Sequence, residues 1–432
     1  MCGTTSASDV FKKAKIGDTV SVRGWIYRTR SSGGIVFTVI RDSTGIVQCT
    51  VIKGELPDED FRAAEKALVE SSVIVEGVVR EDRRAPGGRE IGAKKFTVVH
   101  FAERFPIFKD QTEEFLLDNR HLWLRSREMT QTMKVKALIL RAAREWFFEN
   151  GFVETTPPIL TANACEGGST LFELKYFERK GYLSQSAQLY LEALIFSLEK
   201  VWSLTPSFRA EKSRTPRHLA EFWHLEEEAA WVTLKGNLEI QEQLVSYICQ
   251  YVAKHGKDEL EFLGRNPDDL KVIEPPFQRI PYTKAVDILN DRGFDFRWGE
   301  DFGTNEEREL SMLDNKPIFI TNYPAEIKPF YMKISPDNPK TVENADMLAP
   351  EGYGEIIGGS ERETDIKSME ERLIRDNAAL ENYQWYFDLR RYGSVPHSGF
   401  GLGIERVVRW LCKREHIRDT LPFPRTVARL TP

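Results

Sequence analysis

The stretch from Phe208 to Glu228 constrains the fold of this chain more than any other. An apolar run, Val201 to Leu204, leads into it, and a second alternating run occupies residues 222–228. The polar segment between them contains Pro216 and several cationic side chains. This pattern predicts two antiparallel strands joined by a cationic loop. Guanidinium groups on such a loop suit an anionic ligand, but a solvated hairpin with surface charges fits this stretch equally well.

Size and composition narrow the classes of protein that are possible. The chain has 432 residues, of which 41% are hydrophobic and 29% charged, as is typical of a soluble globular protein with two or three domains. No apolar run approaches the roughly 20 residues of a membrane span. The N-terminal residues also lack the apolar core of a signal peptide. We therefore expect a cytoplasmic protein that does not bind a membrane.

Cysteine, histidine and charge patterns restrict the cofactors and partners. The five cysteines are scattered and form no CxxC pair, and the seven histidines form no HExxH motif, which argues against disulfides and zinc. A carboxylate-bound Mg²⁺ that arrives with a nucleotide is the metal that we expect. The net charge of −6 argues against coating of nucleic acid, and no DNA partner is predicted. Residues 1–105 carry an excess of positive charge, so a polyanion is expected to bind in this part of the chain.

Residues 1–105 show the alternation of a small β-barrel. Strand-like runs separated by Gly- and Ser-containing turns surround a helical stretch, Asp58 to Glu70. This order predicts a five-stranded OB barrel, a fold that binds single-stranded nucleic acid with aromatic platforms and cations. We expect Trp25 to lie in the barrel core and Phe37 to act as a stacking platform.

The remaining chain is predicted to form a linker and a second domain. Residues 106–132 have mixed charges and few apolar repeats, which suits a linker, and residues 133–432 form the second domain. A strong helix is predicted over Val135 to Asn150. The acidic, amphipathic part at about 233–281 is interpreted as a solvated helical insertion.

Two common nucleotide-binding loops are excluded by their context. Gly399, Gly401 and Gly403 have the spacing of a dinucleotide fingerprint, but no βαβ unit follows them near the end of the chain. A GxxxxGK[ST] loop does not occur in the sequence. A nucleotide would therefore be bound by arginines and carboxylates on well-separated strands.

Three stretches resemble the three motifs of class II aminoacyl-tRNA synthetases. The sequence FRAE…RHLAEFWHLEEE (208–228) is similar to motif 2, GFGLGIERVVRW (399–410) to motif 3, and FVETTPPIL (152–160) to the dimer-forming motif 1. With its N-terminal barrel, the chain resembles the aspartyl, asparaginyl and lysyl subgroup. The resemblance implies an α+β chain, in which an anticodon-binding OB barrel precedes a catalytic domain built on an antiparallel sheet flanked by helices. It also implies a homodimer, with Arg28, Phe37 and Gln48 at the anticodon.

The resemblance assigns roles to residues of motifs 2 and 3. Arg209 is expected to bind the α-phosphate and the substrate carboxylate, and Arg406 to clamp the γ-phosphate of ATP. These two arginines are the expected catalytic residues, and they act by electrostatic stabilisation. The other residues expected to bind ATP are Glu211, Arg217, His218, Leu219, Phe222, Glu355, Gly401 and Gly403.

Glu355 is also the expected ligand of Mg²⁺. Aspartyl members of the subgroup have a serine three residues after this carboxylate, where the present chain has Gly358. The second protein ligand is therefore not identified by the resemblance. Glu361 likewise stands where the asparaginyl pattern has glutamine.

The amino acid is predicted from the residues after Gln185. Aspartyl members have a lysine at the position of Leu191, and without it a substrate carboxylate loses its partner. An amide instead needs a donor and an acceptor, which Arg362 and Glu226 can supply. The other residues expected at the amino acid are Glu166, Ser186, Gln188 and Arg209. The resemblance thus implies that ATP activates L-asparagine, which is then transferred to the 3′ end of tRNA(Asn).

Three other functions are alternatives to asparagine activation. The nearest is an aspartyl-tRNA synthetase with relaxed tRNA specificity. A tRNA-independent asparagine synthetase shares the catalytic fold but lacks the barrel. A non-catalytic RNA-binding relative would be expected to lose Arg209, Glu355 or Arg406, and all three are present.

Overall fold

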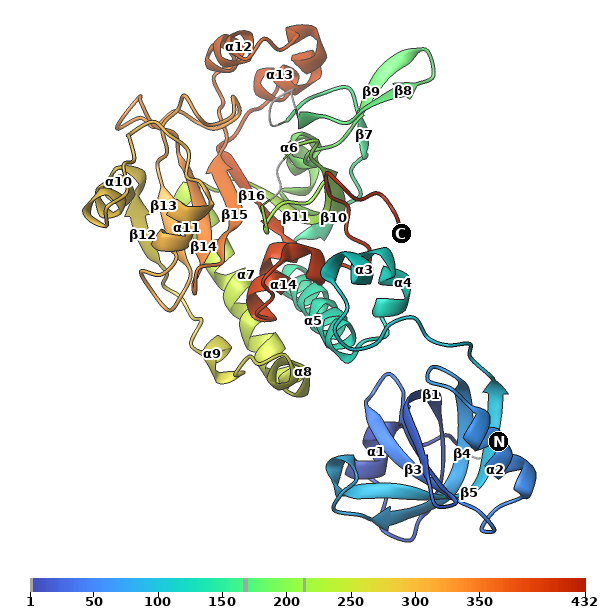
Figure 1. Ribbon diagram of the computed structural model, residues 1–432. Coiled ribbons are helices and arrows are strands. Elements are labelled where there is room, and N and C mark those ends of the chain that lie inside the picture. Colours follow the sequence, from blue (N-terminus) through green and yellow to red (C-terminus); the bar gives the residue numbers. More distant parts are fainter. Residues whose placement is uncertain (1–2, 166–169, 213–214) are drawn as a thin grey trace. The chain divides into compact units, whose positions relative to one another are not determined.

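A computed structural model describes residues 3–165, 170–212 and 215–432, and the chain divides into two compact units, Met1–Leu116 and Leu117–Pro432 (Figure 1). Helix α5 (Arg127–Glu149) begins well before the predicted Val135, because the Ser126 side chain caps it by accepting a hydrogen bond from the Met129 amide. Much of the segment predicted as a linker therefore belongs to the second unit.

The first unit is a closed barrel with the strand order β1-β2-β3-β5-β4, which confirms the predicted OB barrel. Its strands are β1 (Thr19–Ser32), β2 (Ile35–Arg41), β3 (Ile46–Ile52), β4 (Ser72–Glu81) and β5 (Arg89–His100). Helix α2 (Asp58–Lys66) precedes β4 as predicted, and a short helix α1 (Ala7–Lys12) was not predicted. Alternate residues such as Val36 and Ile40 fill the barrel.

The second unit is built on an eight-stranded sheet of the described residues, in the order β12-β13-β14-β15-β16-β11-β10-β6. Its strands are β6 (Val153–Glu154), β10 (Lys200–Phe208), β11 (Glu221–Ala230), β12 (Gln278–Pro281), β13 (Ile318–Thr321), β14 (Asn344–Ala349), β15 (Gly354–Glu361) and β16 (His397–Gly403). The central pairings are antiparallel, and the pairings at both edges are parallel. A small second sheet contains β7 (Leu160–Thr161), β8 (Glu173–Tyr176) and β9 (Arg179–Leu183).

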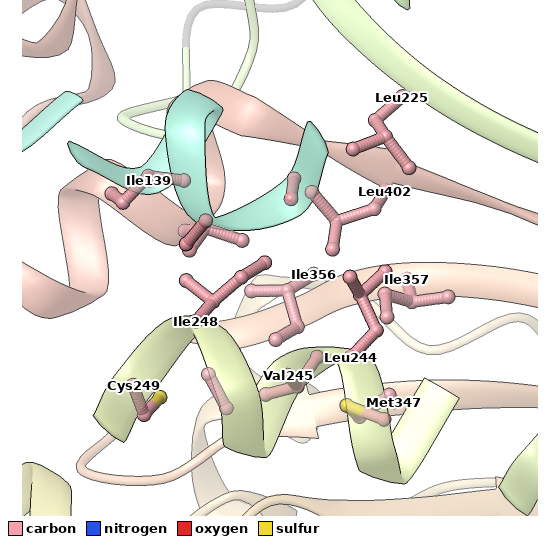
Figure 2. Packing of buried hydrophobic residues seen from close by; sticks show 14 of the residues in the cluster. Ile139, Leu225, Leu244, Val245, Ile248, Cys249, Met347, Ile356, Ile357 and Leu402 are labelled. Atoms are coloured by element: carbon pink, nitrogen blue, oxygen red, sulfur yellow. The ribbon is translucent and has the colours of Figure 1, made fainter. Parts of the chain in front are cut away.

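One face of the large sheet is covered by α5 and α7 (Leu234–His255). Figure 2 shows Leu225, Ile357 and Leu402 of the sheet packed with side chains of these helices, and all belong to one buried cluster. Helix α7 is therefore part of the core, and its interpretation as a solvated insertion was wrong. Its buried polar residues, such as Asn237 and Gln241, gave the segment its solvated appearance.

The remaining helices follow the barrel in the chain, and the first of them spans the boundary between the two units. They are α3 (Glu113–Asp118), α4 (Arg120–Trp123), α6 (Gln188–Leu198), α8 (Lys257–Phe262), α9 (Asp268–Lys271), α10 (Tyr282–Asp291), α11 (Thr304–Leu310), α12 (Ile366–Arg375), α13 (Gln384–Arg391) and α14 (Ile404–Leu411). None of the helices in the described ranges combines the length and apolar character needed to cross a membrane.

Candidate active site

Strands β10 and β11 form the predicted hairpin, and β11 places carboxylates on the face of the sheet away from α5 and α7. Leu225 and Ala229 point into the core cluster, so the alternating Glu226 and Glu228 point to the opposite face. On this face lies a cavity of about 590 Å³, which adjoins a smaller one of about 70 Å³.

Most of the residues predicted at the site line these two cavities. The larger cavity is lined by Ser186, Gln188, Arg209, Glu211, Arg217, His218, Glu226, Glu355, Arg362, Gly401 and Arg406. Leu219, Phe222 and Gly403 line the smaller one. The two predicted catalytic arginines, Arg209 and Arg406, line both. The structure thus brings motifs 2 and 3 together at one place.

Two predicted residues of the amino-acid site are not placed at the cavity. Leu191 is fully buried in a separate apolar cluster with Ala187, Ile195 and Val201, and it is not among the lining residues. Glu166 lies outside the described residues. In this chain, Leu191 therefore contributes to apolar packing and makes no direct contact with the cavity, where the lysine of aspartyl members is expected to meet the substrate.

A glycine of β16 allows motif 3 to pass close to motif 2. A side chain at Gly401 would place its Cβ 2.2 Å from His224 Nε2, so only glycine fits without displacing this histidine. Gly401 pairs with Glu226 across the strands, which fixes the register of the two motifs.

Arginines and carboxylates alternate at the end of the cavity that motif 3 lines. Arg406 forms an ion pair with Glu355 at 2.9 Å, and Arg217 forms one with Glu307. Burial alone would raise the pKa of Glu355, but the guanidinium groups of Arg406 and Arg217 outweigh it and lower this pKa to about 2. Glu355 is therefore ionised at neutral pH.

His218 sits among the same cations. Burial, followed by the charges of Arg406, Arg217 and Arg209, lowers the pKa of His218 to about 4. Its imidazole is thus neutral at pH 7 and contacts the Thr215 hydroxyl through Nδ1. In this state it can bind a ligand by hydrogen bonding but contributes no charge.

Asp346 is a site residue that the sequence analysis missed. A Cβ at Gly358 would lie 3.4 Å from Asp346 Oδ1 and 3.5 Å from Glu355 Oε1, so two carboxylates border this glycine. Burial and the charge of Glu355 raise the pKa of Asp346 to about 6, although Lys328 bonds to it at 2.9 Å. Oxygen ligands that repel one another in this way fit a hard divalent cation.

Ser186 and Glu226 are linked at the amino-acid side of the cavity. The Ser186 hydroxyl and the Ala187 amide both donate to the Glu226 carboxylate, the second at 2.8 Å. Burial raises the pKa of Glu226 in spite of these donors. A side chain that accepts hydrogen bonds in a buried position is suited to an amide donor of a ligand.

Arg362 lies beside this pair and is tied to Glu228. Its Nε and Nη2 donate to the Glu228 carboxylate at 3.0 and 2.8 Å, and its Nη1 donates to Ser360 at 2.7 Å. Glu361, the unexplained departure from the asparaginyl pattern, points elsewhere and accepts from Leu234 and Lys333.

In the barrel, the three predicted anticodon residues lie on adjacent strands. Arg28 pairs with Val39, and Val39 pairs with Gln48, so both side chains share a face with Phe37. The Arg30 guanidinium lies 4.5 Å from the centre of the Phe37 ring. Gln48 is buried and donates to Glu90 at 2.8 Å.

The expectation for Trp25 was wrong. Its side chain is 45% exposed, and Arg41 lies 5.6 Å from the ring centre.

Comparisons with known proteins identify the family. The family described as class II tRNA synthetases (D, K and N) matches residues 112–427, and an OB-fold nucleic acid binding domain matches residues 20–99. The chain belongs to the class II tRNA synthetases of this group. It is accordingly an aminoacyl-tRNA synthetase, as the three motifs predicted.

Individual members of this synthetase group refine the comparison. The asparagine–tRNA ligase of Thermoplasma acidophilum is 50% identical over 99% of this chain and all of its own. The crystal structure of asparaginyl-tRNA synthetase from Pyrococcus horikoshii with asparaginyl-adenylate matches both chains fully, with a TM-score of 0.96 and 51% identity. An aspartyl-tRNA synthetase from Entamoeba histolytica is only 26% identical, at a TM-score of 0.86. The aspartyl alternative is therefore less well supported.

Proposed function

We propose that this synthetase activates L-asparagine with ATP and transfers it to the 3′ end of tRNA(Asn). The asparagine carboxylate attacks the α-phosphorus of ATP and releases pyrophosphate, and a terminal ribose hydroxyl of the tRNA then displaces AMP. The full-length similarity to asparagine–tRNA ligases is the observation that carries this proposal.

The charge state of the cavity supports a neutral side chain over an acidic one. Arg362 already forms four hydrogen bonds to Ser360 and Glu228, and its charge is offset by the Glu228 carboxylate. An arginine compensated in this way can donate to a carbonyl oxygen without needing a second anion. Glu226 of β11, which also lines the cavity, would repel a substrate carboxylate and accept a hydrogen bond from an amide nitrogen.

Arg209 and Arg406 are proposed to carry the chemistry of adenylate formation. Both guanidinium groups face the cavities, Arg209 from motif 2 and Arg406 from motif 3. The Arg209 guanidinium lies 5.7 Å from the centre of the Phe222 ring, which suits adenine stacking beside the α-phosphate. Two fixed cations stabilise the charge that develops at phosphorus, and the attack itself is a matter of positioning.

Glu355 and Asp346 are proposed to hold Mg²⁺, because a carboxylate oxygen of each lies within 3.5 Å of the same point beside Gly358. Bound Mg²⁺ supplies charge neutralisation of the phosphates. Asp346 would take the place of the serine ligand that Gly358 cannot provide.

A homodimer is proposed to form through α5 and the edge strand β6. A groove along α5 ends at Phe148, whose side chain is 78% exposed, and Val153 on β6 is 42% exposed. Within the described residues β6 pairs on one side only, with β10, and such an edge next to exposed apolar groups favours a covering partner. Light scattering should give the mass of two chains.

ATP–pyrophosphate exchange with each amino acid tests the proposed substrate. Asparagine should support exchange with kcat/KM roughly a hundredfold or more above that for aspartate, because a buried amide site penalises the acid. Stronger exchange with aspartate than with asparagine would refute the proposal.

Replacing Phe37 with alanine tests the proposed anticodon contact. Charging of tRNA(Asn) should lose roughly five- to a hundredfold in kcat/KM, the loss expected for one stacked base, whereas exchange without tRNA should not change. Phe108→Ala, at a residue of the same unit with 68% exposure, is the matched control and should charge normally. Equal charging of transcripts with altered anticodons would contradict the roles of Arg28, Phe37 and Gln48.

A further inference from the structure

A buried charge network lies behind the amino-acid side of the cavity, centred on Glu192 of α6. The Glu192 side chain is fully buried, and its carboxylate accepts from three residues of α13 and β16. Tyr386 donates to both oxygens at 2.8 Å, Arg390 donates at 2.6 Å, and His397 Nε2 lies at 3.0 Å. None of these residues had a role in the predicted site.

The network reaches the cavity through two residues that line it. Gln188 Nε2 donates to Glu192 Oε1 at 3.0 Å, which fixes the orientation of the Gln188 amide and leaves its oxygen as the acceptor that a ligand can meet. Arg362 Nε lies 4.0 Å from Glu192 Oε1, and its main partner is Glu228. Glu192 thus orients Gln188 and lies close to Arg362, the two residues of the network that line the cavity.

The hydrogen bonds define the charges of this network. Burial alone would raise the pKa of Glu192, but Arg390 and His397 hold it well below its usual range. His397 Nδ1 lies 2.7 Å from the Val395 carbonyl, while Nε2 faces the ionised Glu192. Both partners are acceptors, so both imidazole nitrogens are placed to donate, and this geometry favours the imidazolium form.

Three cations, Arg362, Arg390 and His397, therefore meet two carboxylates, Glu192 and Glu228. Removal of the Glu192 charge would leave one more positive charge uncompensated behind the pocket. In a buried site such an excess attracts an anionic side chain. The discrimination between an amide and an acid thus depends on a residue that need not touch the substrate.

We propose that Glu192 is a positioning residue that sets the preference for an uncharged side chain. Its carboxylate orients the Gln188 amide and offsets the cations around Arg362, so that the pocket exerts little net pull on a substrate carboxylate. This inference rests on the proposed activation of asparagine.

The test is Glu192→Gln, which keeps the shape and removes the charge. In pyrophosphate exchange, KM for asparagine should rise about tenfold, because the amide of the variant has one acceptor oxygen instead of two, and a donor among Gln188, Tyr386, Arg390 and His397 is left unmatched. The kcat should fall less than KM rises, and KM for ATP should stay the same. The ratio of kcat/KM for aspartate to that for asparagine should rise at least about tenfold.

The His397→Gln variant should not share the increase in the aspartate-to-asparagine ratio that is expected for Glu192→Gln. Glutamine keeps a donor toward Glu192 but removes one positive charge, so the aspartate-to-asparagine ratio should fall or stay low. A residue with a purely structural role would shift both variants in the same direction. Opposite shifts therefore separate an electrostatic role from loss of packing.

Glu242→Gln is the matched control, because Glu242 is a buried carboxylate of the same unit that accepts from Phe277 and Arg279 away from the cavity. In this variant the ratio of kcat/KM for aspartate to that for asparagine should equal the wild-type ratio. If the wild-type protein does not exchange with asparagine, the proposed function fails; if it does and Glu192→Gln leaves the ratio unchanged, the inference is overturned. Should Glu192→Gln not fold, a shift of His397→Gln toward aspartate overturns it instead.

Discussion

Replacing Arg406 with alanine should lower kcat for adenylate formation roughly a hundredfold to a thousandfold, the loss expected when one preorganised charge is removed from a transition state. Arg406 lines both cavities from the first turns of α14, and Glu355 holds its guanidinium at 2.9 Å. The position of the charge is thus fixed before ATP binds, and no reorganisation is needed during the reaction. Exchange kinetics at saturating asparagine and ATP measure the effect.

The same helix offers a control of the same residue type. Arg409 lies over Tyr353 at 5.2 Å, donates to the Tyr353 and Glu415 carbonyls, and is not among the cavity-lining residues. Arg409→Ala should keep kcat within about threefold of the wild-type value. Equal losses in the two variants would mean that α14 acts only as a support, and the role of Arg406 would then be wrong.

Much of this site could be predicted because its residues are close in sequence. Motif 2 is a hairpin and motif 3 a strand followed by a helix, so local patterns predict these elements, and the resemblance to class II synthetases supplies their roles. The barrel is predictable for the same reason, since its strands are regular and joined by short turns.

Asp346 was missed because its position depends on pairing between strands. It lies on the short strand β14, whose residues Asn344–Ala349 show no clear alternation, and it reaches Glu355 only because β14 pairs with β15. Nothing local distinguishes it from the acidic residues nearby.

Leu191 and Glu192 show the complementary limitation. They are neighbours on α6, and helical geometry sends their side chains in different directions, one into an apolar cluster and the other into the buried charge network. The presence of Leu191 in place of a lysine was visible by resemblance, but the buried charge network around Glu192 was not. Only the packing of α6 against β11 and α13 decides this.

Replacing Arg265 with alanine should reduce the free energy of unfolding of the second unit by about 3–5 kcal/mol, because buried carbonyl groups lose a charged donor. The Arg265 side chain is fully buried, and it donates to the carbonyls of Trp410 and Leu411 at the end of α14 at 2.7 and 3.4 Å. Helix α14 ends at Leu411, where the Trp410 carbonyl also accepts from the Lys413 amide at 3.2 Å, and the arginine adds a charged donor to both carbonyls at this C-terminus.

Its acidic partners, Glu351 and Asp269, are 41% and 44% exposed and can be hydrated when Arg265 is removed, so the cost comes mainly from the carbonyls. Urea unfolding followed by tryptophan fluorescence measures the effect, since Trp410 lies in the affected turn. Arg292→Ala is the control, because its ion pair with Glu309 is exposed on both sides and should contribute less than about 1 kcal/mol. If both variants unfold at the same urea concentration, α14 is held by apolar packing alone, and the cap does not support Arg406.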